Sequence, residues 1–86
     1  MAETQEARLK RLKIRCWRRG IKEMDLILGR YADARLAAMT GPELDALEAL
    51  LEENDWDLYY WVTGAREVRA EFAEIVERIA AFHGLR

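Results

Sequence analysis

Apolar residues recur at the spacing of an α-helix along almost the whole chain, and no long stretch alternates as a β-strand does. Five segments carry such stripes, and their members are Leu9, Leu12 and Cys16; Met24, Ile27, Leu28 and Tyr31; Leu44, Leu47 and Leu51; Leu58, Trp61 and Val62; and Val68, Phe72, Ile75, Val76, Ile79 and Phe82. Because each stripe has to be buried against another, the pattern predicts an all-α, compact single-domain bundle of about five helices. We expect the first two helices over residues 4–18 and 21–38, with Gly29 as a weak point in the second.

Polar and turn-forming residues mark the boundaries of the later helices. In the segment TGPE, Thr40 can cap a third helix, Pro42 lies in its first turn, and Glu43 can complete a capping box. Asp55 can cap a short fourth helix. Gly64 then stands where a helix commonly ends in a left-handed residue. These signals predict short turns between the helices.

The length of 86 residues corresponds to one helical-bundle domain, residues 1–86, in which we expect residues 1–7 to fray. A chain this short buries only about 60–65% of its unfolded surface, which leaves little room for a deep active-site pocket. The single cysteine, Cys16, excludes an internal disulfide and fits a reducing compartment. No apolar run is long enough to span a membrane, and the N-terminus lacks the apolar core of a secretion signal. We therefore expect a cytoplasmic protein.

The net charge of −2 hides a strong asymmetry along the chain. Residues 8–22 carry eight basic residues and no acid, whereas residues 43–57 carry seven acidic residues and no base. The basic segment can bind nucleic acid or an acidic protein surface. Alternatively, the two segments face each other within the fold and partly neutralise each other. The sign of the charges alone does not choose between these readings.

No set of residues suggests an enzyme, because nucleophilic catalysis needs a nucleophile, a base and an orienting group in contact. We expect the only histidine, His83, to be a favourable cation at a helix C-terminus or a solvated side chain. Cys16 falls on an apolar stripe, where a free cysteine behaves as a small hydrophobe. One histidine and one cysteine cannot complete a zinc site, and the acids of residues 52–57 do not match a calcium loop. We predict no catalytic residues and no metal site.

The segment WDLYYW concentrates aromatic residues in the fourth helix. Trp61 has the helical spacing of a core residue. Trp56, Tyr59 and Tyr60 cannot all point inward with it, so at least one of them is expected at the surface, where aromatic residues are common at partner interfaces.

Gly20 stands between an arginine pair and Glu23 in the segment RCWRRGIKEMDLILGRY, where glycine costs a helix about 1 kcal/mol relative to alanine. A continuous helix would place Arg19 and Glu23 on one face as an ion pair, but arginine before the acid is the weaker orientation. Two other readings explain the glycine: a left-handed cap between two helices, or a bare patch that another backbone or ligand can approach. Both can hold together, and alanine at Arg19 or Glu23 should then leave the fold intact.

The segment RRGIKEMD, Arg18–Asp25, resembles the Arg-Gly-x-x-Glu signature of the succinate dehydrogenase assembly factors, also called FAD assembly or flavinylation factors. A second block, LLEENDWDLYYWVTG (Leu50–Gly64), is similar to the family's leucines, acid-x-Asp-Leu and following tryptophan. The order, spacing and total length agree, and the resemblance extends from Arg8 to about Phe82.

The resemblance implies a small all-helical protein that binds the flavoprotein subunit of succinate dehydrogenase, or in bacteria of fumarate reductase. It implies that this protein promotes covalent attachment of FAD to that subunit. Arg19, Gly20 and Glu23 would form the partner-binding patch, with Arg18 and Asp25 flanking it. The chemistry then belongs to the flavoprotein, so we expect a monomeric non-enzyme that binds no FAD stably by itself.

Three other functions are alternatives. A nucleic-acid binder using the basic first helix would bind more weakly as salt rises, but the acidic remainder repels phosphate and no recognition-helix motif is present, so we do not expect nucleic acid as a partner. A direct flavin carrier would need a glycine-rich phosphate loop or a pocket, and the sequence shows neither. An antitoxin-like regulatory role has been attributed to some members of the family, and the residues neither support nor exclude it.

Overall fold

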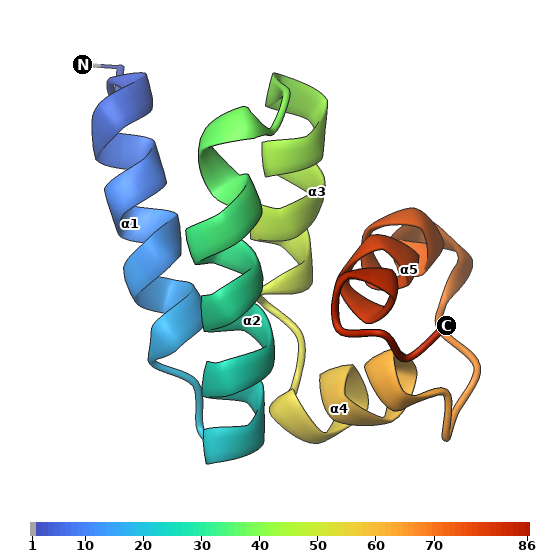
Figure 1. Cartoon of the computed structure of the whole chain (residues 1–86). Coiled ribbons are helices and arrows are strands. Elements are labelled where there is room, and N and C mark those ends of the chain that lie inside the picture. The colour runs from blue at the N-terminus through green and yellow to red at the C-terminus, as the bar shows by residue number, and fades with distance from the viewer. Residues whose placement is uncertain (1) are drawn as a thin grey trace.

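The helices follow one another with short connections, as Figure 1 shows for the computed structural model, which describes residues 2–86. Their bounds are α1 Gln5–Trp17, α2 Lys22–Arg35, α3 Gly41–Leu50, α4 Asp55–Thr63 and α5 Ala73–Phe82, with short 3₁₀ turns at Leu36–Ala38 and Ala70–Phe72. Residues 2–86 contain no strand, so the predicted all-α, single-domain class is confirmed. Of the segment expected to fray, Met1 lies outside the described residues, and Thr4 caps α1. Each described helix is too short or too polar to traverse a lipid bilayer.

The first three helices run in alternating directions along one side of the molecule, and α4 and α5 lie on the other side (Figure 1). α1 packs along α2, α4 contacts α5, and α2 reaches both α4 and α5. The residues of the five apolar stripes form the core between these helices. Four stripe members, Leu9, Ile27, Val68 and Phe82, are only partly buried and pack against the edge of the core.

Two of the predicted helix boundaries are confirmed in detail. The Thr40 hydroxyl accepts a hydrogen bond from the Glu43 backbone N–H at 3.3 Å, and the Glu43 carboxylate accepts one from the Thr40 backbone N–H at 2.8 Å. This reciprocal pair is the capping box expected at the start of α3. Gly64 ends α4 with a φ of 84°, which is the left-handed conformation that favours glycine.

Two other predicted boundaries are wrong. Asn54, not Asp55, caps α4, because its Oδ1 accepts hydrogen bonds from the backbone N–H groups of Trp56 at 2.8 Å and Asp57 at 3.4 Å. Asparagine and aspartate are about equally good at this position, so the sequence pattern could not choose between the neighbours. The last helix begins after a 3₁₀ turn, so Val68 lies in the preceding loop instead of on the helix.

Gly29 does not interrupt α2, which continues through it. A Cβ atom at Gly29 would overlap the ring of Trp17, so the indole at the end of α1 lies directly against the backbone of α2. The indole Nε1 also donates a hydrogen bond to Asp33 Oδ1 at 3.1 Å. The glycine therefore lets the two helices approach closely at this point.

Candidate functional site

The predicted contact residues lie at the corner between α1 and α2, where residues 18–21 are not helical. Asp25, in the first turn of α2, reaches back and accepts a hydrogen bond from the Arg19 backbone N–H at 2.5 Å. Ile21 precedes α2 and provides no side-chain cap. The Asp25 carboxylate therefore ties the corner to the positive end of α2, where a negative charge is favourable.

Arg19 points into the protein, and only 10% of its side chain is exposed. Its guanidinium donates from Nε to Asp55 Oδ1 at 2.7 Å, from Nη1 to the Leu51 carbonyl at 2.8 Å and from Nη2 to the Glu53 carbonyl at 3.0 Å. The two carbonyls belong to the turn that follows α3, where the helix dipole favours a positive charge. Arg19 thus joins the α1–α2 corner to the segment between α3 and α4.

The Asp55 carboxylate that binds Arg19 also holds Gly20. Its N–H donates to Asp55 Oδ2 at 2.6 Å, and a Cβ atom at Gly20 would lie 2.6 Å from that oxygen. Among residues 2–86, only Gly64 and Gly84 have a positive φ, so the left-handed cap considered for Gly20 is wrong. Glycine is required because the backbone and a carboxylate of the same chain approach too closely to admit a side chain.

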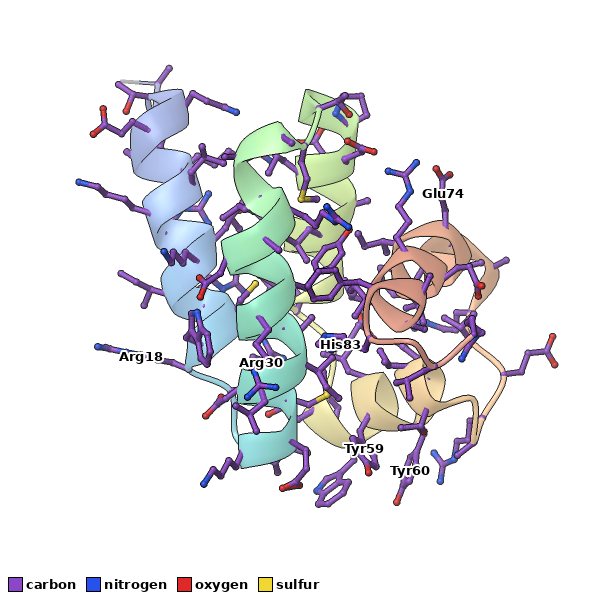
Figure 2. All side chains as sticks on the ribbon, in the orientation of Figure 1. Arg18, Arg30, Tyr59, Tyr60, Glu74 and His83 are labelled. Carbon is purple, nitrogen blue, oxygen red and sulfur yellow. The ribbon has the colours of Figure 1, made fainter. Side chains whose placement is uncertain are left out.

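Arg18 and Glu23 lie on the outside of the corner. Both residues are exposed, and Figure 2 shows the Arg18 side chain extending away from the lower end of α1. Arg19 pairs with Asp55, so the ion pair that a continuous helix would form between Arg19 and Glu23 is not made. Of the five predicted residues, the structure brings Arg19, Gly20 and Asp25 into one hydrogen-bonded group and leaves Arg18 and Glu23 exposed.

Asp55 is the site residue that the sequence reasoning missed. Its carboxylate uses both oxygens at the corner, and its side chain is 17% exposed. The pattern contained one signal that could have found it: Asn54 and Asp55 are two successive cap-forming residues, and a helix start needs only one. The second was therefore free for another role.

An aromatic cluster follows Asp55 directly on α4. The rings of Trp56, Tyr59 and Tyr60 have centroids 6.0 to 6.1 Å apart. Trp56 is 49% exposed, which confirms that at least one of the three lies at the surface. Tyr59 and Tyr60, labelled on α4 in Figure 2, are half-buried, and Tyr59 packs against the edge of the core. The Arg66 guanidinium lies 4.7 Å from the centroid of the Tyr60 ring. The cluster places aromatic surface next to the corner.

The arginines of α1 pair with acids of α3 and of the turn after it, whereas Lys10 pairs with Glu6 and Lys13 with Asp33. These ion pairs of the arginines are Arg8 with Asp45 at 2.6 Å and Glu48 at 3.1 Å, Arg11 with Glu48 at 2.8 Å, and Arg15 with Glu52 at 3.5 Å. The Arg11 and Arg8 guanidinium groups lower the pKa of Glu48 below its ordinary value. Of the two readings of the charge asymmetry, the structure therefore shows the one in which the segments face each other.

The thiol and the imidazole are not among the groups that hold the corner. Burial raises the pKa of the Cys16 thiol to about 12, as expected for an unreactive core cysteine. His83 follows α5 as predicted, but it is half-buried, and its Nε2 donates to the Ile27 carbonyl at 2.7 Å, so the reading of a freely solvated side chain is wrong. Within residues 2–86, no three His, Cys, Asp or Glu side chains are grouped so as to hold a metal ion.

A hollow of about 440 Å³ lies at the opposite end of α2 from the corner. Its lining residues are Tyr31, Arg35, Ala38, Met39, Glu43, Arg78, Ala81 and Phe82. The charged side chains of this hollow are already engaged, because Arg78 pairs with Glu43 and the Arg35 guanidinium lies 5.3 Å from the centroid of the Phe82 ring. The corner, with its exposed glycine and glutamate, is the better candidate for a contact site.

The fold and the corner define a small all-α protein built around an Arg-Gly turn that two aspartates hold in place. The sequence profile of the family described as flavinator of succinate dehydrogenase matches residues 10–83. The chain belongs to this family, which confirms the resemblance noted for Arg18–Asp25 and Leu50–Gly64.

Curated relatives support the same family. This chain is 44% identical to a protein of Meyerozyma guilliermondii over 61 aligned residues, which are 71% of this chain and 45% of the relative. It is 48% identical over 61 positions to a protein of Lodderomyces elongisporus, covering 71% and 37%. It is 36% identical over 72 positions to a protein of Mycosarcoma maydis, covering 84% and 30%. All three relatives are named succinate dehydrogenase assembly factor 2, mitochondrial.

These comparisons also bear on length and location. The chain spans less than half the length of the curated relatives described above. The cytoplasmic location predicted from the sequence is wrong by this comparison, because the relatives are named as mitochondrial proteins.

Proposed function

We propose that this protein binds the flavoprotein subunit of succinate dehydrogenase, or of fumarate reductase, and promotes covalent attachment of FAD to it. The observation that carries the proposal is the Arg-Gly corner, in a chain whose family is named for this role. The corner presents the Gly20 backbone and the Glu23 carboxylate at the surface of a fixed turn. Asp55 occupies the side of Gly20 to which a Cβ atom would point, so a partner would contact the exposed side of the turn and the Glu23 carboxylate beside it.

The protein acts in this proposal by contact, as a chaperone and not as an enzyme. Arg19, Asp25 and Asp55 are engaged in holding the turn, and the Cys16 thiol is buried, so we assign the bond-forming chemistry to the flavoprotein and its FAD. The protein itself binds no FAD stably and works as a monomer. The aromatic cluster on α4 extends the surface that a partner could cover.

The proposal is tested by measuring covalent flavin on the flavoprotein subunit, read as in-gel fluorescence from cells that carry each variant in place of the natural protein. Glu23→Ala removes an exposed carboxylate of the patch, and Glu67→Ala removes an exposed carboxylate of the loop after α4 as a matched control. We expect Glu23→Ala to lower affinity for the subunit roughly thirtyfold and to reduce covalent flavin, with both variants melting like wild type.

Normal covalent flavin with a folded Glu23→Ala protein would contradict the placement of the patch. A separate titration of free FAD into the purified protein should show no saturable change in flavin fluorescence at micromolar concentration. A one-to-one binding isotherm would instead favour a flavin carrier.

A further inference from the structure

Asp55 stands at the first position of α4 but takes no part in capping it. Asn54 accepts hydrogen bonds from two of the free backbone N–H groups at the start of this helix. The Asp55 carboxylate is turned toward the α1–α2 corner, where Oδ1 accepts from the Arg19 guanidinium and Oδ2 accepts from the Gly20 N–H. One side chain therefore holds two successive residues of the Arg-Gly turn.

Arg19 directs all three of its guanidinium nitrogens toward its own chain. They donate to Asp55, to Leu51 and to Glu53. Only 10% of the arginine side chain is exposed, so a partner at the surface has little access to it. Gly20 and Glu23, by contrast, are exposed and available.

We propose that Asp55 is a positioning residue: it holds the Arg-Gly turn in the conformation in which Gly20 and Glu23 contact the flavoprotein subunit and keep it in the arrangement that attaches FAD. Arg19 acts through this aspartate and through the turn after α3, without touching the partner. This inference rests on the proposed function, because it concerns how the same surface is held in the shape that promotes flavin attachment.

The chemistry of the contact explains why an aspartate is required. Two donors, the Arg19 Nε–H and the Gly20 N–H, converge on one side chain, so both of its polar atoms have to accept. Asparagine has the same shape but offers one acceptor and one donor, so in either orientation an N–H group would face an N–H group. Asp55→Asn therefore loosens the turn with little change in volume.

The test uses purified wild-type protein, apo-flavoprotein subunit and FAD, and it measures the rate of covalent flavin formation as the concentration of the protein is raised to saturation. Asp55→Asn is compared with Asp57→Asn, because Asp57 is a second aspartate of α4 and its ion pair, with Arg66 at 3.6 Å, lies outside the Arg-Gly turn. We expect the maximal rate at saturation to fall roughly tenfold for Asp55→Asn and to stay unchanged for Asp57→Asn.

The maximal rate separates positioning from stability. A residue that only stabilises the fold would lower the melting temperature while leaving the saturated rate equal to wild type at a temperature where the variant is folded. Arg19→Lys provides a second variant, which weakens the same contact by changing the arginine instead of the aspartate. Lysine keeps the positive charge but lacks the planar set of N–H donors that arginine directs at several acceptors. It should show the same loss of maximal rate.

Coupling between the two residues completes the test. If Arg19 acts through Asp55, the double variant Arg19→Lys, Asp55→Asn should be no slower than the slower single variant. Wild-type saturated rates for both folded single variants would overturn the positioning role while leaving the proposed function in place. A wild-type protein that does not accelerate flavin attachment at all would overturn both.

Discussion

The two ends of one row of arginines show what burial does to an ion pair. Along the exposed part of the row, the pairs are Arg8 with Asp45, Arg11 with Glu48 and Arg15 with Glu52, and two of the acids, Asp45 and Glu52, have side chains 72% exposed. In the last pair, Arg19 with Asp55, both side chains are shielded from water, and both also form hydrogen bonds with backbone groups.

The two ends differ in how the remaining charge is solvated after one partner of the ion pair is removed. When an exposed pair is broken, water and salt solvate the remaining charge, so such pairs contribute little to stability. When a shielded pair is broken, the remaining charge stays where water solvates it poorly, and the loss of stability is large. The exposed row aligns α1 with α3, whereas the shielded end fixes a backbone conformation.

The largest expected effect is that of Arg19→Ala, which breaks the shielded pair. It leaves the Asp55 carboxylate without its cation and two carbonyls without a donor, so the free energy of unfolding should fall by about 3 kcal/mol. The structure thus replaces the expectation that this variant would leave the fold undisturbed. Thermal melting should show a decrease of more than about 10 °C, whereas Arg18→Ala, on the exposed side of the corner, should melt close to wild type. Equal melting of the two variants would contradict the shielding.

An intermediate effect is expected for Gly20→Ala. The new methyl group would meet Asp55 Oδ2, and the carboxylate could move aside only by weakening its hydrogen bonds to Arg19 and to the residue 20 N–H. We expect a loss of about 1–2 kcal/mol in chemical denaturation. In an Asp55→Ala background the obstructing carboxylate is gone, so the same substitution should cost clearly less. An equal cost in both backgrounds would place the clash elsewhere.

The smallest effect is expected in the exposed row, and its pH dependence identifies it. Glu48→Gln should lower the free energy of unfolding by at most about 1 kcal/mol at pH 7. The arginines lower the Glu48 pKa in the folded state, so its contribution is present above the ordinary carboxyl pKa and is lost as pH falls through the lowered value. The stability difference between wild type and Glu48→Gln should therefore be constant near neutrality and vanish in acid. A difference that grows on acidification would contradict this sign.

The sequence predicted well the features that depend on neighbours in the chain. The apolar stripes located the core, and the Thr40–Glu43 capping box and the left-handed Gly64 follow from local geometry that any helix boundary imposes. Gly20 was also recognised as a residue that needed an explanation.

The residue that explains Gly20 could not be found in the same way. Asp55 lies 35 positions further along the chain, and it is one of seven acids in residues 43–57. Which of these acids reaches the corner depends on how the α3–α4 turn is placed, and that placement results from the packing of the whole bundle. Local patterns therefore identified one half of the contact and assigned the other half to capping.

The close packing of Trp17 against Gly29 has a consequence for how this sequence can diverge. The ring occupies the space that a side chain at position 29 would need, so the two positions are not free to change in any order. A lineage that first shortens Trp17 opens room that a later alanine at position 29 can fill. The reverse order passes through an intermediate in which a methyl group and an indole compete for one volume, and selection for folding should remove it. Related chains should therefore show a side chain at position 29 only where the aromatic ring at position 17 has already been replaced.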